Sequence, residues 1–139
     1  MEDAKLVIVD TSVILKWFFW ESDRKNALKI RDEFIAGQIN LGMPTHCLVE
    51  VGNILGIKQP ENAVLIISEI QMMQIEEYHL SLELVQQAIK IMRKFPKTSF
   101  YDAMYHAIAI ENRGVFVTAD KKYYDSTKSL KHMKLLSEY

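Results

Sequence analysis

The sequence has few of the residues that indicate a disulfide-rich, fibrous or membrane protein. Its one cysteine, Cys47, allows no internal disulfide and no cysteine-rich zinc cluster. Five glycines and three prolines are too few for a collagen-like or low-complexity chain. No apolar run approaches the roughly 20 residues of a membrane span, and the run after the acidic start MEDAK is too short for a signal peptide. We therefore expect a soluble, cytoplasmic protein.

An excess of charge of one sign is also missing. The 17 basic and 18 acidic residues give a net charge of -1, whereas strong non-specific nucleic-acid binders are usually basic overall. Hydrophobic residues make up 49% of the chain, which is ordinary for a globular protein. With 139 residues and no long linker, residues 1–139 are expected to form one domain. Lysines near the C-terminus fit either a solvated face or a local basic rim: Lys121, Lys122, Lys128, Lys131 and Lys134.

Apolar patterning predicts strands alternating with helices. Strands are expected at residues 5–9, 39–44, 74–80, 115–118 and 132–139. Helical spacing is found in segments 10–19, 21–37, 44–57, 58–73, 81–95 and 99–114. This alternation predicts an α/β domain whose parallel sheet is covered on both faces.

Local signals indicate where several of these helices begin. Thr11 or Ser12 is expected to cap the first helix, and Pro44 fits the first turn of the third. Ser81 and Ser99 are the expected caps of the last two helices.

Four acids are candidates for a shared site. Asp10 and Asp120 each follow a predicted strand, and ligands of open α/β sheets bind at the carboxyl ends of strands. Glu50 and Asp102 have mainly apolar neighbours within predicted helices. Each acid also has a simpler interpretation. Asp10 and Asp120 can cap helices, Asp102 can complement a helix dipole, and Glu50 can face solvent.

Convergence of the four acids would require a cation. Two like charges about 4 Å apart repel by roughly 4 kcal/mol at an effective dielectric constant near 20. Hard divalent ions such as Mg²⁺ or Mn²⁺ take oxygen ligands and relieve this repulsion. The sequence therefore favours a magnesium or manganese site.

Four blocks of sequence resemble the PIN-domain family, and specifically the VapC-like toxin ribonucleases. They are VDTSVILKWF, P-x5-E-x2-N-x-L (from Pro44 to Leu55), FYDAMYHAIA and VTADKKYY, in family order along nearly the whole chain. The resemblance implies a three-layer α/β/α sandwich with a central, mainly parallel sheet. It also implies Mg²⁺- or Mn²⁺-dependent endoribonuclease activity, with Asp10, Glu50, Asp102 and Asp120 as catalytic and metal-binding residues. Polar positions beside the acids correspond to Thr11, Ser12, Asn53 and Thr118.

The chain departs from the family pattern at two positions that bear on the site. Some members have a further acid where this chain has Tyr123, so a second metal site is expected to be weaker or filled differently. Gly52 replaces a better helix former near Glu50, which predicts a locally loose helix.

The resemblance further implies a toxin of a type II toxin–antitoxin pair, with an RNA substrate, a VapB-like antitoxin and a homodimeric state. Two alternatives stay open: a non-toxin PIN nuclease of RNA processing, and a non-catalytic RNA-binding PIN module. An unrelated phosphate-binding domain is disfavoured because no glycine-rich loop follows a strand.

Two further features have competing interpretations. His46 precedes Glu50 by four residues and His106 follows Asp102 by four, so each can share a helical face with its acid. Such a pair can bind metal or phosphate, or can simply lie on a helix surface. The aromatic run Trp17–Trp20 is expected to place at least two rings in the core, and any exposed ring suits a protein partner.

Overall fold

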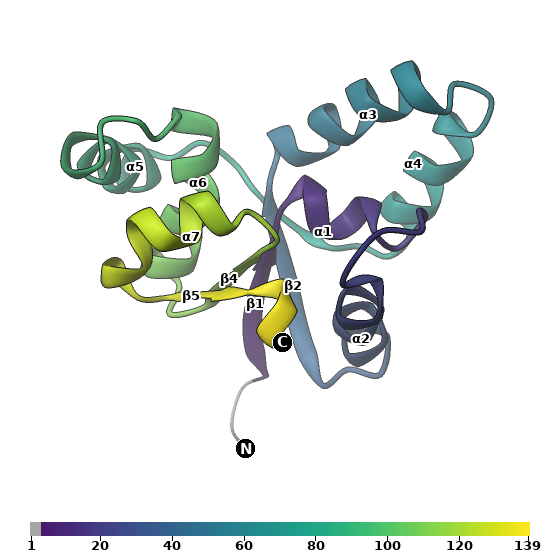
Figure 1. The fold of residues 1–139 in the computed structure, drawn as a ribbon, viewed down its shortest axis with the longest axis horizontal. Helices are drawn as coiled ribbons and strands as arrows, with labels where there is room; N and C mark the ends of the chain where they lie inside the picture. Colours follow the sequence, from purple (N-terminus) through teal and green to yellow (C-terminus); the bar gives the residue numbers. More distant parts are fainter. Residues whose placement is uncertain (1–3) are drawn as a thin grey trace.

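The computed structural model describes residues 4–139, so the acidic start at residues 2–3 lies outside the described part. Five strands form one sheet in the order β3-β2-β1-β4-β5, and every neighbouring pair is parallel (Figure 1). This confirms the predicted α/β fold. The strands are β1 (Lys5–Val9), β2 (Ile39–Pro44), β3 (Glu76–Tyr78), β4 (Val115–Thr118) and β5 (Met133–Leu135).

Helices cover both faces of the sheet, which gives the three layers that were expected. Helices α1–α4 lie on one side and α5–α7 on the other, and α6 packs across β1, β2 and β4 (Figure 1). Their bounds are α1 (Thr11–Leu15), α2 (Arg24–Ile35), α3 (His46–Lys58), α4 (Ala63–Met72), α5 (Leu82–Lys94), α6 (Phe100–Glu111) and α7 (Lys121–Thr127). Short 3₁₀ turns follow at Lys128–Leu130 and Leu136–Glu138. Within residues 4–139, no helix is both long and apolar enough to cross a bilayer.

The central strand β1 explains where a ligand site can form. Val7, Ile8 and Val9 are fully buried because helices cover both faces of this strand. The chain runs outward from β1 through β2 to β3, then returns to place β4 on the other side of β1. The register pairs Val9 with Val117, so β1 and β4 end side by side. Strand order thus reverses between β1 and β4, which is where open α/β sheets bind ligands.

The residues that begin the helices agree only in part with the sequence prediction. Ser81 and Ser99 cap α5 and α6 as predicted, each accepting a backbone N–H. The predicted cap of α1 was wrong: Asp10, rather than a following hydroxyl residue, accepts the N–H of Val13. Pro44 ends β2 instead of opening α3, because its backbone continues the strand as far as its pairing with Tyr78.

Two elements differ from the sequence prediction in their extent. The short helix α7 was not predicted, although Asp120 caps it. The first helix ends at Leu15, so the aromatic run that follows it lies in turns rather than on a helix.

Candidate active site

A cleft of about 360 Å³ opens beside the ends of β1 and β4. All four predicted acids line it, and each comes from a different part of the chain: the end of β1, the middle of α3, the start of α6 and the loop after β4. Thr11 and Ser12 line it as well. The structure therefore brings together Asp10, Glu50, Asp102, Asp120, Thr11 and Ser12.

Asp10 is the most firmly held of the acids. Its Oδ1 accepts hydrogen bonds from Ser12 Oγ at 2.5 Å and from Val13 N at 3.2 Å. Its Oδ2 accepts one from Thr118 Oγ1 at 2.7 Å. Burial raises the pKa of Asp10, and these three hydrogen bonds oppose the rise. The carboxylate thus caps α1, and one lone pair on Oδ2 has no donor among residues 4–139.

Glu50 is held by a tyrosine that the sequence analysis did not single out. Tyr105 Oη donates to Glu50 Oε1 at 3.0 Å, while the Tyr105 ring is buried. The same hydroxyl lies 3.4 Å from Thr11 Oγ1. Desolvation raises the pKa of Glu50, and the hydrogen bond from Tyr105 opposes that rise. Tyr105 follows Asp102 by three residues on α6, and that spacing was the available sequence signal.

The other two acids are exposed at the beginnings of helices. Asp102 lies in the first turn of α6, where desolvation at the cleft raises its pKa and the negative charge of Asp120 adds to the rise. Asp120 caps α7, and its Oδ1 accepts a hydrogen bond from Tyr123 N at 3.0 Å. The simpler interpretations are therefore also correct: Asp120 caps α7, and Asp102 complements the dipole of α6. Both acids line the cleft as well.

The remaining polar candidates take different positions. Thr118 is buried behind Asp10, where its Oγ1 donates to Asp10 Oδ2 and accepts a hydrogen bond from Asp120 N at 3.0 Å. Asn53 is exposed and does not line the cleft, whereas its neighbour Ile54 does. Glu21 is a fifth acid at the cleft, paired with the buried Lys16 at 3.0 Å. Nothing in its sequence context distinguished Glu21 from an ordinary loop acid.

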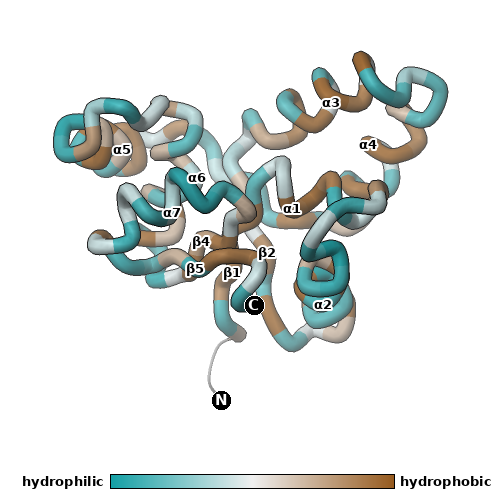
Figure 2. The backbone as a smooth tube through the Cα atoms, viewed as in Figure 1, coloured by the Kyte–Doolittle hydropathy of each residue, from teal (hydrophilic) through white to brown (hydrophobic). Residues whose placement is uncertain are grey.

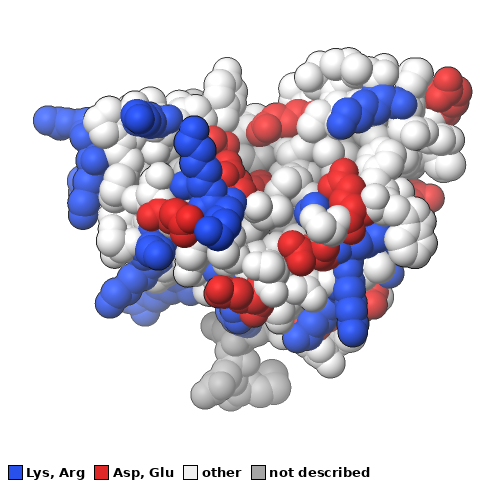
Figure 3. Space-filling view, viewed as in Figure 1, with Lys and Arg blue, Asp and Glu red and all other residues white. Residues whose placement is uncertain are grey.

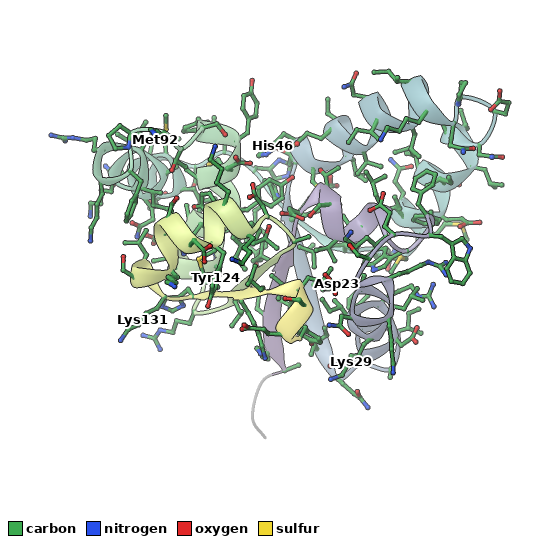
Figure 4. All side chains as sticks on the ribbon, viewed as in Figure 1. Asp23, Lys29, His46, Met92, Tyr124 and Lys131 are labelled. Carbon is green, nitrogen blue, oxygen red and sulfur yellow. The ribbon has the colours of Figure 1, made fainter. Side chains whose placement is uncertain are left out.

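The two histidines have different environments. His46 lies between the two halves of the molecule (Figure 4), with its ring edge-on to Tyr101 and Tyr105. Its Nε2 is 3.3 Å from Glu50 Oε1, but this buried nitrogen makes no hydrogen bond with any group in residues 4–139. Burial lowers the pKa of His46, so the contact involves a neutral ring.

His106 is a fully buried core residue, so the interpretation of it as a helix-surface residue was wrong. Its Nδ1 lies 2.9 Å from Tyr123 Oη, and its Nε2 lies 2.7 Å from the carbonyl of Lys131. The ring thereby joins α6 to α7 and to the loop before β5. Burial lowers the pKa of His106, which keeps the ring neutral.

The aromatic run divides between core and surface. Trp17 is buried and donates Nε1–H to the carbonyl of Ala27 at 2.9 Å, and Phe18 and Phe19 pack against the core. Trp20 is 89% exposed, with the Arg24 guanidinium 4.3 Å from its ring centre. The expectation that at least two rings pack in the core is confirmed.

The donor set of the cleft suits a hard divalent ion. Carboxylates dominate it, and oxygen ligands are those that Mg²⁺ and Mn²⁺ prefer. As the side chains stand in residues 4–139, no three acidic, histidine or cysteine groups lie close enough to share one ion. Binding of an ion by three of them would therefore need side-chain rotation, which the exposed Asp102 and Asp120 allow.

Comparison with known protein families assigns the fold. Residues 7–128 match the PIN domain family, so this chain belongs to that family. No curated protein sequence matches it.

Solved structures with the same fold include toxins of toxin–antitoxin systems. VapC20 of Mycobacterium tuberculosis, described as a sarcin-ricin loop cleaving toxin, has a TM-score of 0.66 and 16% identity over 87% of this chain and 95% of that one. A toxin–antitoxin complex from Klebsiella pneumoniae gives 0.69 and 15% identity, over 94% and 97%. PAE2754 of Pyrobaculum aerophilum gives 0.70 and 16% identity, over 99% and 90%. At these identities the likeness establishes a shared fold.

Proposed function

We propose that this chain is an endoribonuclease that uses Mg²⁺ or Mn²⁺ to hydrolyse RNA phosphodiester bonds, and that it is the toxin of a type II toxin–antitoxin pair. One observation carries the proposal: four carboxylates from distant parts of a PIN domain line a single cleft. A pocket of this charge has no use in binding polyanionic RNA unless a cation neutralises it. Membership of the PIN domain family supports a nuclease role for the same cleft.

In this proposal, the residues divide into ion-holding and positioning groups. Asp10, Glu50, Asp102 and Asp120 would hold the ion, which supplies positive charge to the phosphoryl oxygens and acidifies water. The hydroxyls of Ser12 and Thr118 position the Asp10 carboxylate and favour its ionised form.

Tyr105 has the same positioning role for Glu50. Because two of the four carboxylates are already fixed by hydrogen bonds, fewer groups need to be ordered when substrate binds.

An antitoxin partner is part of the proposal because a solved toxin–antitoxin complex shares this fold. Figure 2 shows hydrophobic residues along α3 and α4, and several of them are exposed. Exposed apolar residues support a protein partner, whether a VapB-like antitoxin or a second copy in a homodimer. Val64 is 84% and Met72 79% exposed, and Ile57 and Leu65 are exposed as well. A cytoplasmic location fits an RNA substrate and a single reduced cysteine.

Cleavage of single-stranded RNA by the purified protein tests the enzymatic proposal. We expect cleavage in Mg²⁺, its loss in EDTA and its return with added Mn²⁺. Binding of RNA without cleavage in either metal would instead favour the non-catalytic module. Growth arrest on expression, relieved by the product of an adjacent gene, would separate a toxin from an RNA-processing nuclease.

A further inference from the structure

A second groove adjoins the acidic cleft. It has a volume of about 460 Å³ and shares Asp102 and Asp120 with the cleft. Because the two hollows have these acids in common, a chain bound at the carboxylates can continue directly into the groove. The rest of the groove comes from the α5–α6 connection and the start of α7, chiefly Lys94, Phe95, Pro96, Lys97, Thr98 and Lys122.

Unlike the cleft, this groove has basic side chains beside the two shared aspartates. Lys94, Lys97 and Lys122 are exposed, and within residues 4–139 none of them forms a salt bridge. The adjacent Lys121, in contrast, pairs with Asp125 at 3.3 Å and does not line the groove. Figure 3 shows basic side chains gathered over the half formed by α5 and α7, and acidic ones at the hollow beside it. The three groove lysines are therefore free to bind an anion.

The groove also has an apolar, aromatic component. Phe95 and Pro96 line it, and Lys94 Nζ lies 5.7 Å from the centre of the Phe95 ring. Proteins bind single-stranded RNA by stacking an unpaired base on an aromatic ring and holding its phosphate with a cation. A volume of about 460 Å³ lies within the range of pockets that hold molecules of nucleotide size.

We propose that this groove is a subsite for one unstacked nucleotide next to the bond that is cut. The inference rests on the proposed nuclease function of the adjoining cleft. Phe95 and Pro96 take the base, and the lysines take the flanking phosphates. A base within a duplex cannot reach Phe95, because its two faces are already stacked.

Binding measurements in a non-cleaving background test the subsite. The protein with Asp10→Asn is titrated in Mg²⁺ against a fluorescein-labelled, ten-nucleotide, single-stranded oligoribonucleotide, and fluorescence anisotropy is followed at several salt concentrations. We expect the triple variant Lys94→Ala/Lys97→Ala/Lys122→Ala to weaken binding roughly tenfold or more. The slope of log K against log salt should fall in magnitude by about two, since each lost phosphate contact contributes about 0.7.

Two further variants separate charge from stacking. Phe95→Leu keeps the apolar contact with the core and removes the aromatic face, so binding should weaken roughly fivefold with an unchanged salt slope. Lys121→Ala is the matched control on the same helix turn, and its affinity should stay within about twofold of the parent. Thermal unfolding verifies that the exposed substitutions leave the fold intact.

The subsite would be overturned if the triple variant bound the oligonucleotide like Lys121→Ala, or if a duplex of the same sequence bound as tightly as the single strand. Failure of the nuclease proposal gives a different result. The protein without substitutions would then cleave no RNA in Mg²⁺ or Mn²⁺, while RNA binding would still depend on the three lysines.

Discussion

The two walls of the acidic cleft hold their carboxylates in different ways. On the wall formed by β1 and α3, Asp10 accepts three hydrogen bonds and Glu50 is held by the buried Tyr105. On the wall formed by α6 and α7, Asp102 and Asp120 are exposed. The Asp120 carboxylate accepts a backbone hydrogen bond from Tyr123, and Asp102 has Ser99, the cap of α6, as its hydrogen-bonding neighbour.

This difference separates a preorganised wall from an adaptable one. Partly buried carboxylates that are hydrogen-bonded to the fold have their geometry set by it, whereas exposed ones are free to rotate towards a ligand. Substitutions on the fixed wall should therefore change both stability and activity. Substitutions of the exposed acids should change activity with little effect on the fold.

Asp10→Asn is expected to have the largest effect. Cleavage of single-stranded RNA in Mg²⁺ should fall about 1,000-fold or more, which corresponds to several kcal/mol of lost transition-state stabilisation. The variant should also unfold at a higher temperature in EDTA at pH 7. Because burial raises the pKa of Asp10 above its ordinary value of 3.8, the ionised carboxylate destabilises the metal-free fold at that pH. Calorimetry and a cleavage assay measure the two effects.

Asp32→Asn, which replaces an exposed acid on α2, is the control. It should change neither the cleavage rate nor the unfolding temperature. If Asp10→Asn cleaved RNA as fast as the unsubstituted protein, the most firmly held acid would be dispensable. The proposal that the fixed wall is preorganised for catalysis would then be wrong.

Tyr105→Phe tests whether the hydrogen bond to Glu50 matters apart from the tyrosine ring. The ring packing is kept, so we expect a loss of roughly 10- to 100-fold in activity or metal affinity with a small change in stability. Rates measured over a range of Mg²⁺ concentrations show which quantity changes. Tyr124→Phe on α7 is the control, and an equal effect in both variants would mean that Tyr105 does not position the acid.

His106 connects the two helices of the adaptable wall, because its ring on α6 contacts Tyr123 on α7. Substitution of His106 therefore tests how much this contact stabilises the wall. Burial lowers the pKa of His106 below the ordinary 6.5, so the stability contributed by the neutral ring is present above that pH and is lost as the pH falls towards the folded-state pKa. We expect the unfolding temperature to fall between pH 7.5 and pH 5.5. His106→Gln should cost about 1–3 kcal/mol at pH 7.5 and flatten this dependence.

His79→Gln, at an exposed position, is the matched control for the pH profile. If the unfolding temperature of His106→Gln depended on pH as steeply as that of the unsubstituted protein, groups other than His106 would cause the dependence.

The smallest expected effect concerns Gly52, two residues after Glu50 on the fixed wall. A methyl group at this position would meet no atom within 4 Å, so Gly52→Ala should raise the free energy of unfolding by about 0.5–1 kcal/mol without loss of cleavage. Gly37→Ala is the opposite case, because Gly37 follows α2 with a φ of +75°, which strains an alanine. This variant should lower the free energy of unfolding by about 1–2 kcal/mol. Urea unfolding of both variants compares them, and a destabilising Gly52→Ala would show that α3 needs a glycine there.

The sequence predicted most of the fold and the location of the acids, because both follow from local patterns. Apolar runs bounded by Asp10 and Asp120 placed two carboxylates at strand ends, and the parallel sheet brings those ends together. Tyr105 could not be singled out in this way, because its hydroxyl reaches Glu50 only after α3 and α6 pack. Likewise, the core position of His106 depends on contacts with Tyr123 and Lys131 that no local pattern specifies.

Binding of Mn²⁺ is the most direct test of the central claim that the four acids hold one divalent-ion site. Water-proton relaxation or calorimetry would compare the unsubstituted protein with Asp10→Asn, Glu50→Gln, Asp102→Asn and Asp120→Asn, using Asp32→Asn as the control. We expect each of the four substitutions to weaken Mn²⁺ binding and the control to leave it unchanged. Equal binding by the unsubstituted protein and all four variants would contradict it.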